Sequence, residues 1–274
     1  MIELLNRKYD FDPTQDKKPI VMEYINKVGI SNLLTKFKVN YQSKIENYTG
    51  NIDVYMDLKE NKKGIHMSRI IESINEVVES NNISKSIEEV GLRILNKLKN
   101  KHEFNIGEIS INTHYFITKP TINTKKVTHE AYEVTINIVK ENNTCYKNIK
   151  ISVIGNTLCP HSLNMTKGKS HIQRAQLIVE IKTKYETNIN IENIINKCEE
   201  SFTTPTYTLL KSPDEAELVD KMFDNGKFVE DVVRECYSNI KNMLTIGEIL
   251  IKVISNESIH KHNAIAQIHK KIGD

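Results

Sequence analysis

The change from strand to helix periodicity falls within residues 50–98, which read GNIDVYMDLKENKKGIHMSRIIESINEVVESNNISKSIEEVGLRILNKL. Alternate residues at its start are apolar (Ile52, Val54 and Met56), as in a half-buried strand. Apolar residues then recur every three or four positions in two runs, Ile70, Ile71, Ile74, Val77 and Val78, followed by Ile87, Val90, Ile94, Leu95 and Leu98. Ser86 and Glu89 have the spacing of a helix capping box. The stretch therefore predicts one strand followed by two helices.

Strands are predicted on both sides of this stretch. Before it, Phe37, Val39 and Tyr41 alternate with polar residues, and residues 48–51 (YTGN) supply turn chemistry between two strands. After it, alternation returns at Ile109, Ile111, Thr113, Tyr115 and Ile117, and again at Tyr132, Val134, Ile136 and Ile138. The first half is thus predicted to have the element order ββααββ.

The second half shows a similar succession of patterns. Strands are predicted near residues 149–153, 175–181, 249–253 and 264–268, and helices near 191–198, after Pro213 and near 228–240. We therefore predict an α+β chain of two tandem ββααββ modules with antiparallel sheets and helices packed on one face. The predicted divisions are an N-terminal arm at 1–30, a first module at 31–140 and a second module at 141–274.

The composition is that of an ordinary globular protein, with 39% hydrophobic and 27% charged residues. The net charge of +3 comes from 38 basic and 35 acidic residues, which argues against a nucleic-acid binder. The four cysteines form no CxxC pair, and no segment approaches the roughly 20 apolar residues of a membrane span. The N-terminus has no apolar signal core. These features predict a cytoplasmic, soluble protein with reduced thiols and neither a nucleic-acid nor a membrane partner.

Two segments carry side chains that can bind metal. Cys159 and His171 flank a loop between two predicted strands, and a thiolate with an imidazole suits zinc or iron(II). A buried cysteine is, however, as often a small hydrophobe. His260 and His262 follow a strand, where we expect the two rings to face opposite sides, so that one binds metal and the other donates a proton. A plain surface HxH is the alternative.

Two acidic segments are ambiguous without further context. Asp214 and Glu215 follow Pro213 at a helix start, where capping and the helix dipole explain the acids equally well. Glu230 falls on an amphipathic helix, where a solvated acid is the ordinary interpretation.

Five motifs together resemble those of the type IB family of GTP cyclohydrolase I, over about residues 27–268. Residues 64–69 (GIHMSR) are similar to its G-[TI]-[HN]-M-S-R signature. Residues 159–162 (CPHS) and 171–174 (HIQR) stand where the family has C-P-C-S and H-N-Q-R, with the Cys and His twelve residues apart. Residues 209–215 (LLKSPDE) and 226–231 (GKFVED) resemble L-L-K-R-P-D-E and P-K-F-V-E-D, and residues 257–262 (ESIHKH) keep E-S-I-H-x-H.

The resemblance implies the tunnelling fold (T-fold) and a homotetramer with active sites at subunit interfaces. It implies GTP cyclohydrolase I activity, a hydrolase acting on a cyclic amidine. The imidazole ring of GTP is opened by hydrolysis, formate is released, and 7,8-dihydroneopterin triphosphate forms as a precursor for folate (tetrahydrofolate) and queuosine.

The resemblance also implies residue roles. A divalent metal ion (Mn, Fe(II) or Zn) would be held by Cys159, His171, Glu215 and His260, with Glu257 as a variable ligand. Glu230 would grip the N1–H and 2-amino donors of guanine. The candidates for triphosphate and ribose are His66, Arg69, Lys211 and Arg174. The implied catalytic residues are Cys159, His161 and His262, with His262 as general acid and base.

Three departures leave alternatives open. His161 stands in place of the second Cys of C-P-C-S, Ile172 replaces the Asn of H-N-Q-R, and Ser212 replaces the Arg of L-L-K-R. One alternative is the related archaeal iron-dependent enzyme, which makes 7,8-dihydroneopterin 2′,3′-cyclic phosphate. The short spacing from Cys159 to His171 favours the type IB form over it, because archaeal relatives usually carry a long insertion there. The other alternative is a catalytically inactive relative that binds purine or pterin and metal. His161 and Ser212 favour this form, whereas Glu230 and the HxH segment argue against it.

Overall fold

The computed structural model describes residues 14–41 and 43–273. The chain divides into two compact units. Unit 1 comprises the described residues of Met1–Ile111 together with Ile138–Cys145, and unit 2 comprises Asn112–Asn137 together with the described residues of Tyr146–Asp274. Two long strands, β3 (Ile106–Pro120) and β4 (Val127–Glu141), contribute residues to both units.

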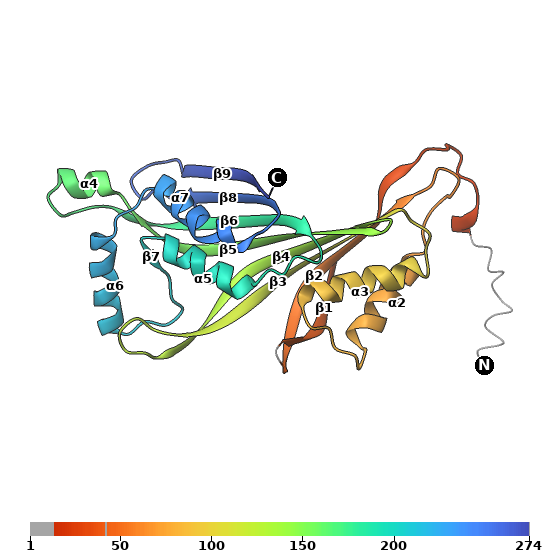
Figure 1. Cartoon of the computed structure of the whole chain (residues 1–274), viewed down its shortest axis with the longest axis horizontal. Coiled ribbons are helices and arrows are strands. Elements are labelled where there is room, and N and C mark those ends of the chain that lie inside the picture. The colour runs from red at the N-terminus through yellow and green to blue at the C-terminus, as the bar shows by residue number, and fades with distance from the viewer. Residues whose placement is uncertain (1–13, 42, 274) are drawn as a thin grey trace. The chain divides into compact units, whose positions relative to one another are not determined.

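Unit 1 packs a pair of helices against a hairpin, as Figure 1 shows. The elements that lie wholly within it are η1 (Thr14–Asp16), β1 (Ile25–Tyr41), β2 (Lys44–Leu58), α2 (Met67–Val78) and α3 (Ile87–Lys99). The predicted cap of the second helix is confirmed, because the Ser86 hydroxyl accepts the N–H of Glu89 at 3.2 Å. Gly91 allows α3 to approach the sheet, since a Cβ there would lie only 2.8 Å from the Ile138 side chain.

Unit 2 holds most of the remaining elements. They are β5 (Thr144–Leu158), α4 (Pro160–Met165), β6 (Ile172–Lys184), α5 (Ile191–Ser201), β7 (Thr204–Pro205), α6 (Ser212–Asp224), α7 (Val229–Ile240), η2 (Lys241–Met243), β8 (Gly247–Ser255) and β9 (Ala264–Ile272). Strands β5, β6, β8 and β9 pair antiparallel in that order. Alternate residues on each strand are buried, as in Ile149, Ile151 and Val153 of β5.

The prediction of two tandem ββααββ modules is wrong. The strands form a nine-stranded sheet in the order β1-β2-β3-β4-β5-β6-β8-β9, with the short β7 beside β5. The second half also has α4 between its first two strands, and α5, β7, α6 and α7 before β8. The module boundary was predicted between residues 140 and 141, at the end of β4, and residues 142–143 form the turn of a β4–β5 hairpin, with Asn142 at φ 50°. The turn therefore joins neighbouring strands of one sheet and does not separate two modules.

The predicted arm at residues 1–30 contains both described and undescribed positions. Residues 1–13 lie outside the described residues, Thr14–Asp16 form η1, and β1 begins at Ile25. No helix within the described parts of the chain is long and apolar enough to cross a membrane.

Candidate functional site

One pocket of unit 2 gathers six of the predicted site residues. Its volume is about 430 Å³, and the six residues come from three separate segments of the chain: Cys159 and His171, then Glu230, then Glu257, His260 and His262. They meet because β5, β6 and β8 are hydrogen-bonded neighbours, so that the loops at one edge of these strands converge. Thr157, Gln173, Lys227, Phe228, Val229, Ala264 and Ile265 complete the walls. We call this cavity the site pocket.

Cys159 and His171 lie opposite each other, one residue beyond the β5–β6 ladder. The ladder ends at the pair Leu158 and Ile172, and the Cys159 N–H donates to the His171 carbonyl at 3.3 Å. The half-buried Cys159 side chain caps α4, because its Sγ accepts the N–H of Ser162 at 3.4 Å. The strand ends thus bring a thiol and an imidazole to one wall of the site pocket.

The His171 ring is held from one side. Its Nδ1 lies 2.8 Å from Oε1 of Gln173 and 3.7 Å from a carboxylate oxygen of Glu257. Both oxygens are hydrogen-bond acceptors, so Nδ1 is the donor, and in the neutral tautomer with hydrogen on Nδ1 the lone pair is on Nε2. This is the arrangement in which histidines commonly bind metal ions.

His260 and His262 lie on the exposed turn between β8 and β9. Their rings stack with centroids 5.1 Å apart and planes 11° from parallel. The prediction that they face opposite sides is therefore wrong. Residues i and i+2 of an extended segment project to the same side, and the turn preserves that relation. Both imidazoles consequently lie at the same pocket.

Glu230 occupies the first turn of α7, at a position fixed by its neighbours. Asp231 accepts the Phe228 N–H at 3.1 Å and so caps the helix. The half-buried Lys227 ammonium donates to the carbonyls of residues 201 and 202 at the end of α5, and pairs with Glu235 at 2.7 Å. These contacts hold the segment that presents the Glu230 carboxylate to the pocket.

Four other predicted residues of unit 2 do not line this pocket. His161 is exposed on α4, and Arg174, next to Gln173 on β6, projects from the opposite face of the strand. Lys211 and Glu215 are exposed at the start of α6. That helix buries Asp214, Leu218 and Met222, whereas Glu215, at the flank of the buried face in the first turn, remains exposed.

His66 and Arg69 line a separate pocket of about 230 Å³ within unit 1. His66 precedes α2 and lies 3.6 Å from the Asp16 carboxylate, and Arg69 donates to the Lys101 carbonyl at 3.1 Å. Burial, and secondarily the charge of Arg69, lowers the pKa of His102, another residue of this pocket, despite an opposing hydrogen bond to His66. Cationic groups at the start of a helix form an environment suited to phosphate.

No group of three or more His, Cys, Asp or Glu side chains in the described residues is close enough to hold a metal ion. The donor set nevertheless has the right chemistry, since a thiol, three imidazoles and carboxylates line the site pocket. The lone pair left on His171 Nε2 also fits a metal ligand. The residues of this pocket that could hold a divalent ion are Cys159, His171, His260 and Glu257.

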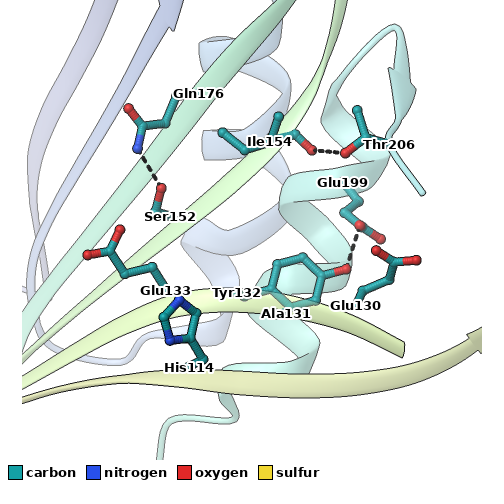
Figure 2. Close-up of a pocket in the computed structure, with 10 residues that line it drawn as sticks. All are labelled: His114, Glu130, Ala131, Tyr132, Glu133, Ser152, Ile154, Gln176, Glu199 and Thr206. Atoms are coloured by element: carbon teal, nitrogen blue, oxygen red, sulfur yellow. Dashed lines mark hydrogen bonds between the residues drawn. The ribbon is translucent and has the colours of Figure 1, made fainter. Parts of the chain in front are cut away.

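A second pocket of unit 2, of about 240 Å³, is lined by polar side chains of β3 to β6 and α5 (Figure 2). Its acid Glu199 is already paired, because it accepts from Tyr132 at 2.7 Å and from Lys119 at 2.6 Å. Burial, and then the charge of Glu199, raises the pKa of Tyr132 well above its usual value.

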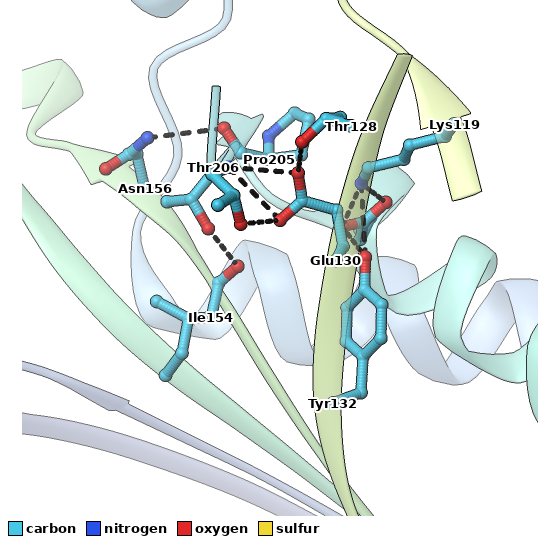
Figure 3. A network of polar contacts seen from close by, with 10 residues as sticks. Lys119, Thr128, Glu130, Tyr132, Ile154, Asn156, Pro205 and Thr206 are labelled. Carbon is cyan, nitrogen blue, oxygen red and sulfur yellow. Dashed lines mark hydrogen bonds and ion pairs between the residues drawn. The ribbon is translucent and has the colours of Figure 1, made fainter. Parts of the chain in front are cut away.

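The other buried acid of that pocket, Glu130, is also paired (Figure 3). It accepts from the Thr128 hydroxyl at 2.8 Å and from both the N–H and the hydroxyl of Thr208. The two carboxylates therefore join β4 to α5 and to the segment after β7. We interpret them as structural groups.

Thr157, Gln173 and Lys227 line the pocket without having been predicted as site residues. Gln173 lies inside the HIQR segment, so the motif itself was a signal for it. Lys227 likewise lies inside the GKFVED segment, whereas Thr157 had no comparable signal, because its position in the pocket depends on strand register.

Comparison with known proteins gives the family. Residues 11–266 match the model described as "Type I GTP cyclohydrolase folE2". GTP cyclohydrolase MptA of Pyrococcus abyssi is 41% identical over 93% of this chain and 97% of its own length. The MptA of Thermococcus kodakarensis is 42% identical over 94% and 98%. GTP cyclohydrolase FolE2 of Dictyoglomus turgidum is 34% identical over 90% and 93%.

Among solved structures, uricase from Arthrobacter globiformis aligns with a TM-score of 0.56 at 8% identity, over 93% of this chain and 96% of that chain. At this identity the likeness shows the fold alone, which is tunnelling-like. The motifs, the site pocket and the match over nearly the whole chain lead to one conclusion: this chain belongs to the type I GTP cyclohydrolase family.

Proposed function

We propose that this chain opens the imidazole ring of GTP by hydrolysis and releases formate. The observation that carries the proposal is that residues of three separate family motifs line one pocket. Its volume of about 430 Å³ lies in the range of small-molecule sites, roughly 300–1,000 Å³. The Glu230 carboxylate is suited to the adjacent N1–H and 2-amino donors of guanine, which it can accept with both oxygens.

Proton transfer is proposed for the stacked histidines. Opening the ring and releasing formate each require protons to be taken up and delivered, and imidazoles do both near neutral pH. His262 is the proposed general acid and base. Cys159 and His161 are further proposed catalytic residues, His161 on motif position alone.

A divalent metal ion, Mn, Fe(II) or Zn, is proposed as the cofactor. Cys159, His171 and His260 are its proposed ligands, with Glu257 and Glu215 as carboxylate candidates. When bound, such an ion lowers the pKa of a coordinated water and so supplies a nucleophile near neutral pH. The support from this chain is the donor set of the site pocket and the lone pair on His171 Nε2.

For the product we propose 7,8-dihydroneopterin 2′,3′-cyclic phosphate. The observation that favours it is the greater similarity to the archaeal relatives from Pyrococcus and Thermococcus, at 40–42% identity, than to the bacterial FolE2 relatives, at 31–34%. The second candidate is 7,8-dihydroneopterin triphosphate, which the twelve-residue spacing from Cys159 to His171 favours.

Phosphate and ribose contacts are proposed for His66, Arg69, Lys211 and Arg174, and a homotetramer for the assembly. The support for His66 and Arg69 is their pocket at the start of α2. Arg174 and Lys211 are exposed cations, which a substrate or a second copy of the chain can reach.

The test is anaerobic incubation of the purified protein with GTP and Mn(II), Fe(II) or Zn(II). Formate is quantified and the pterin is identified by mass spectrometry. Formate with a cyclic phosphate supports the proposal in full, and formate with a triphosphate supports the second product. Protein that binds GTP but releases no formate with any of the three metals contradicts the proposed activity.

A further inference from the structure

A buried chain of hydrogen bonds leads from β8 to the His171 ring. The Ser255 and Thr157 hydroxyls are 3.1 Å apart, the Gln173 amide donates to Thr157 Oγ1 at 3.1 Å, and Oε1 of Gln173 lies 2.8 Å from His171 Nδ1. Ser255, Thr157 and Gln173 are 0%, 1% and 8% exposed. Water therefore has little access to these groups, and each depends on the next for its hydrogen bond.

The strand register explains why these side chains meet. Thr157 on β5 is directly opposite Gln173 on β6, so both project from the same face of the sheet. Ser255 ends β8, where it pairs with Ala175 of β6. His171 lies two residues before Gln173, on the same face of the extended chain. The network thus rests on three paired strands.

The hydrogen bond to Thr157 fixes which end of the Gln173 amide faces His171. The Gln173 NH₂ group donates to Thr157, which leaves Oε1 as the end that faces His171. The Ser258 hydroxyl also donates to Oε1, at 3.5 Å. An oxygen at that position requires hydrogen on Nδ1, and of the two neutral tautomers it selects the one with an unprotonated Nε2.

We propose that Gln173 is the positioning residue for His171: it fixes the ring orientation and selects the tautomer whose Nε2 can bind metal. The inference rests on the proposed function, because the role of His171 as a metal ligand is part of it. The hydrogen bonds of Gln173 are observed in this chain. Gln173 acts through the imidazole. The Glu257 carboxylate, at 3.7 Å, is too distant for a hydrogen bond to Nδ1, so Gln173 is the closer of the two acceptors.

Three variants test the inference. Gln173→Leu removes the acceptor and keeps a similar volume. Gln173→Glu restores an oxygen that accepts from Nδ1, although it loses the donor to Thr157. Gln176→Leu is the matched control, because Gln176 is also on β6 and makes a similar bond, to Ser152 Oγ at 2.7 Å, but lines the other pocket of unit 2.

The first measurement is the tautomer of His171 in metal-free protein. It is read from ring ¹⁵N shifts of histidine-labelled protein about two pH units above the usual histidine pKa of about 6.5. A His171→Asn variant assigns the signal. The wild-type protein, Gln173→Glu and Gln176→Leu are expected to show hydrogen on Nδ1, and Gln173→Leu is expected to lose that preference. Hydrogen on Nε2 in the wild type overturns the inference.

The second measurement is Mn(II) affinity, determined by competition with a chelator. Gln173→Leu is expected to bind about 10- to 100-fold more weakly, as for other residues that orient metal-binding histidines, and Gln173→Glu within several-fold of wild type. Unchanged affinity in Gln173→Leu, or equal loss in both Gln173 variants, contradicts the inference.

If Gln173→Leu does not fold, the tautomer of Gln173→Glu is compared with that of wild type and of Thr157→Val, in which the hydrogen bond between residues 173 and 157 is also lost. Hydrogen on Nδ1 in Gln173→Glu supports the inference, and its loss overturns it. Absence of formate release by the wild type contradicts the proposed function and leaves the tautomer result intact.

Discussion

The Asp214 carboxylate accepts the backbone N–H of Thr124 at 2.7 Å, which joins the start of α6 to the β3–β4 connection. It also accepts the Thr124 hydroxyl at 2.6 Å and the N–H groups of Asn123 and Lys211. Burial raises the pKa of Asp214, but the hydrogen bonds outweigh it and hold that pKa well below its usual value. The acid beside the predicted ligand Glu215 is therefore a structural anchor.

This anchor predicts an acid-sensitive stability. Because the folded-state pKa is depressed, the stabilisation is fully present above the ordinary Asp pKa of about 3.9 and is lost as pH falls toward the folded value. We expect Asp214→Asn to lower the melting temperature at neutral pH and to show a shallower loss of stability below about pH 4 than wild type. Thermal melts between neutral and acidic pH measure both. Parallel pH profiles of the two proteins would contradict this role.

Gly155 is predicted to tolerate no side chain. A Cβ at this position of β5 would lie 2.3 Å from the ring of Phe202, which is 1% exposed and rigid. We expect Gly155→Ala to destabilise the fold by about 1–3 kcal/mol, the usual cost of overpacking a core. Urea unfolding measures this. Gly64→Ala is the control, since its Cβ would meet only the Gln15 side chain at 3.6 Å and should have little effect.

The pair Lys119 and Glu199 offers a test of the polar network that joins both side chains to the Tyr132 hydroxyl. Their side chains are 16% and 11% exposed, so removal of one charge leaves the other poorly solvated. We expect Lys119→Met to cost about 3 kcal/mol in unfolding free energy. The more exposed pair Lys197 and Glu200 on α5, 2.5 Å apart against 2.6 Å for Lys119 and Glu199, provides the control, and Lys197→Met should cost less than about 1 kcal/mol. Equal losses would show that the Lys119 pair is not effectively buried.

The local structure was largely predictable from the sequence, whereas the pairing of strands was not. The alternation at Ile149, Ile151 and Val153 predicts that one face of this strand is buried, and these residues are indeed 0% exposed. The alternation does not indicate which other strand pairs with it in the sheet. The prediction of two modules, divided between residues 140 and 141, failed because β4 and β5 are neighbours in one sheet, joined by a hairpin turn at residues 142–143. A turn of this composition is equally consistent with a boundary.

The site was predictable where motif residues occupy strand ends and less so on helices. Cys159 and His171 meet through the β5–β6 register. Whether Glu215 faces the same pocket depends on the rotation of α6, which is set by the burial of Leu218 and Met222 against Leu158. That packing depends on tertiary contacts between distant parts of the chain, and no pattern in a single sequence indicates it.

Glu230 provides a direct test of guanine recognition. Glu230→Gln replaces one carboxylate oxygen by an NH₂ group that would face the guanine donors, so we expect GTP turnover to fall at least about 100-fold, the loss of roughly 3 kcal/mol of charge-assisted hydrogen bonding. Formate release per enzyme measures this. Glu192→Gln, an exposed acid on α5, should retain full activity. Normal turnover of Glu230→Gln would remove this residue from the substrate site.

His161 provides a test of the most unusual position in the motifs. It is exposed on α4, two residues after Cys159, whose thiol caps the helix, and it stands where the motif C-P-C-S of the similar family has its second cysteine. If the position serves the same purpose in this chain, a thiol should replace the imidazole, because both groups exchange protons near neutral pH. We therefore expect His161→Cys to hold or raise the rate of formate release and His161→Ala to lower it. The pH dependence of the rate separates the two side chains, since an ordinary thiol titrates about two units above an ordinary imidazole. A large loss in His161→Cys, with the fold intact by circular dichroism, would show that the imidazole serves a purpose of its own in this chain.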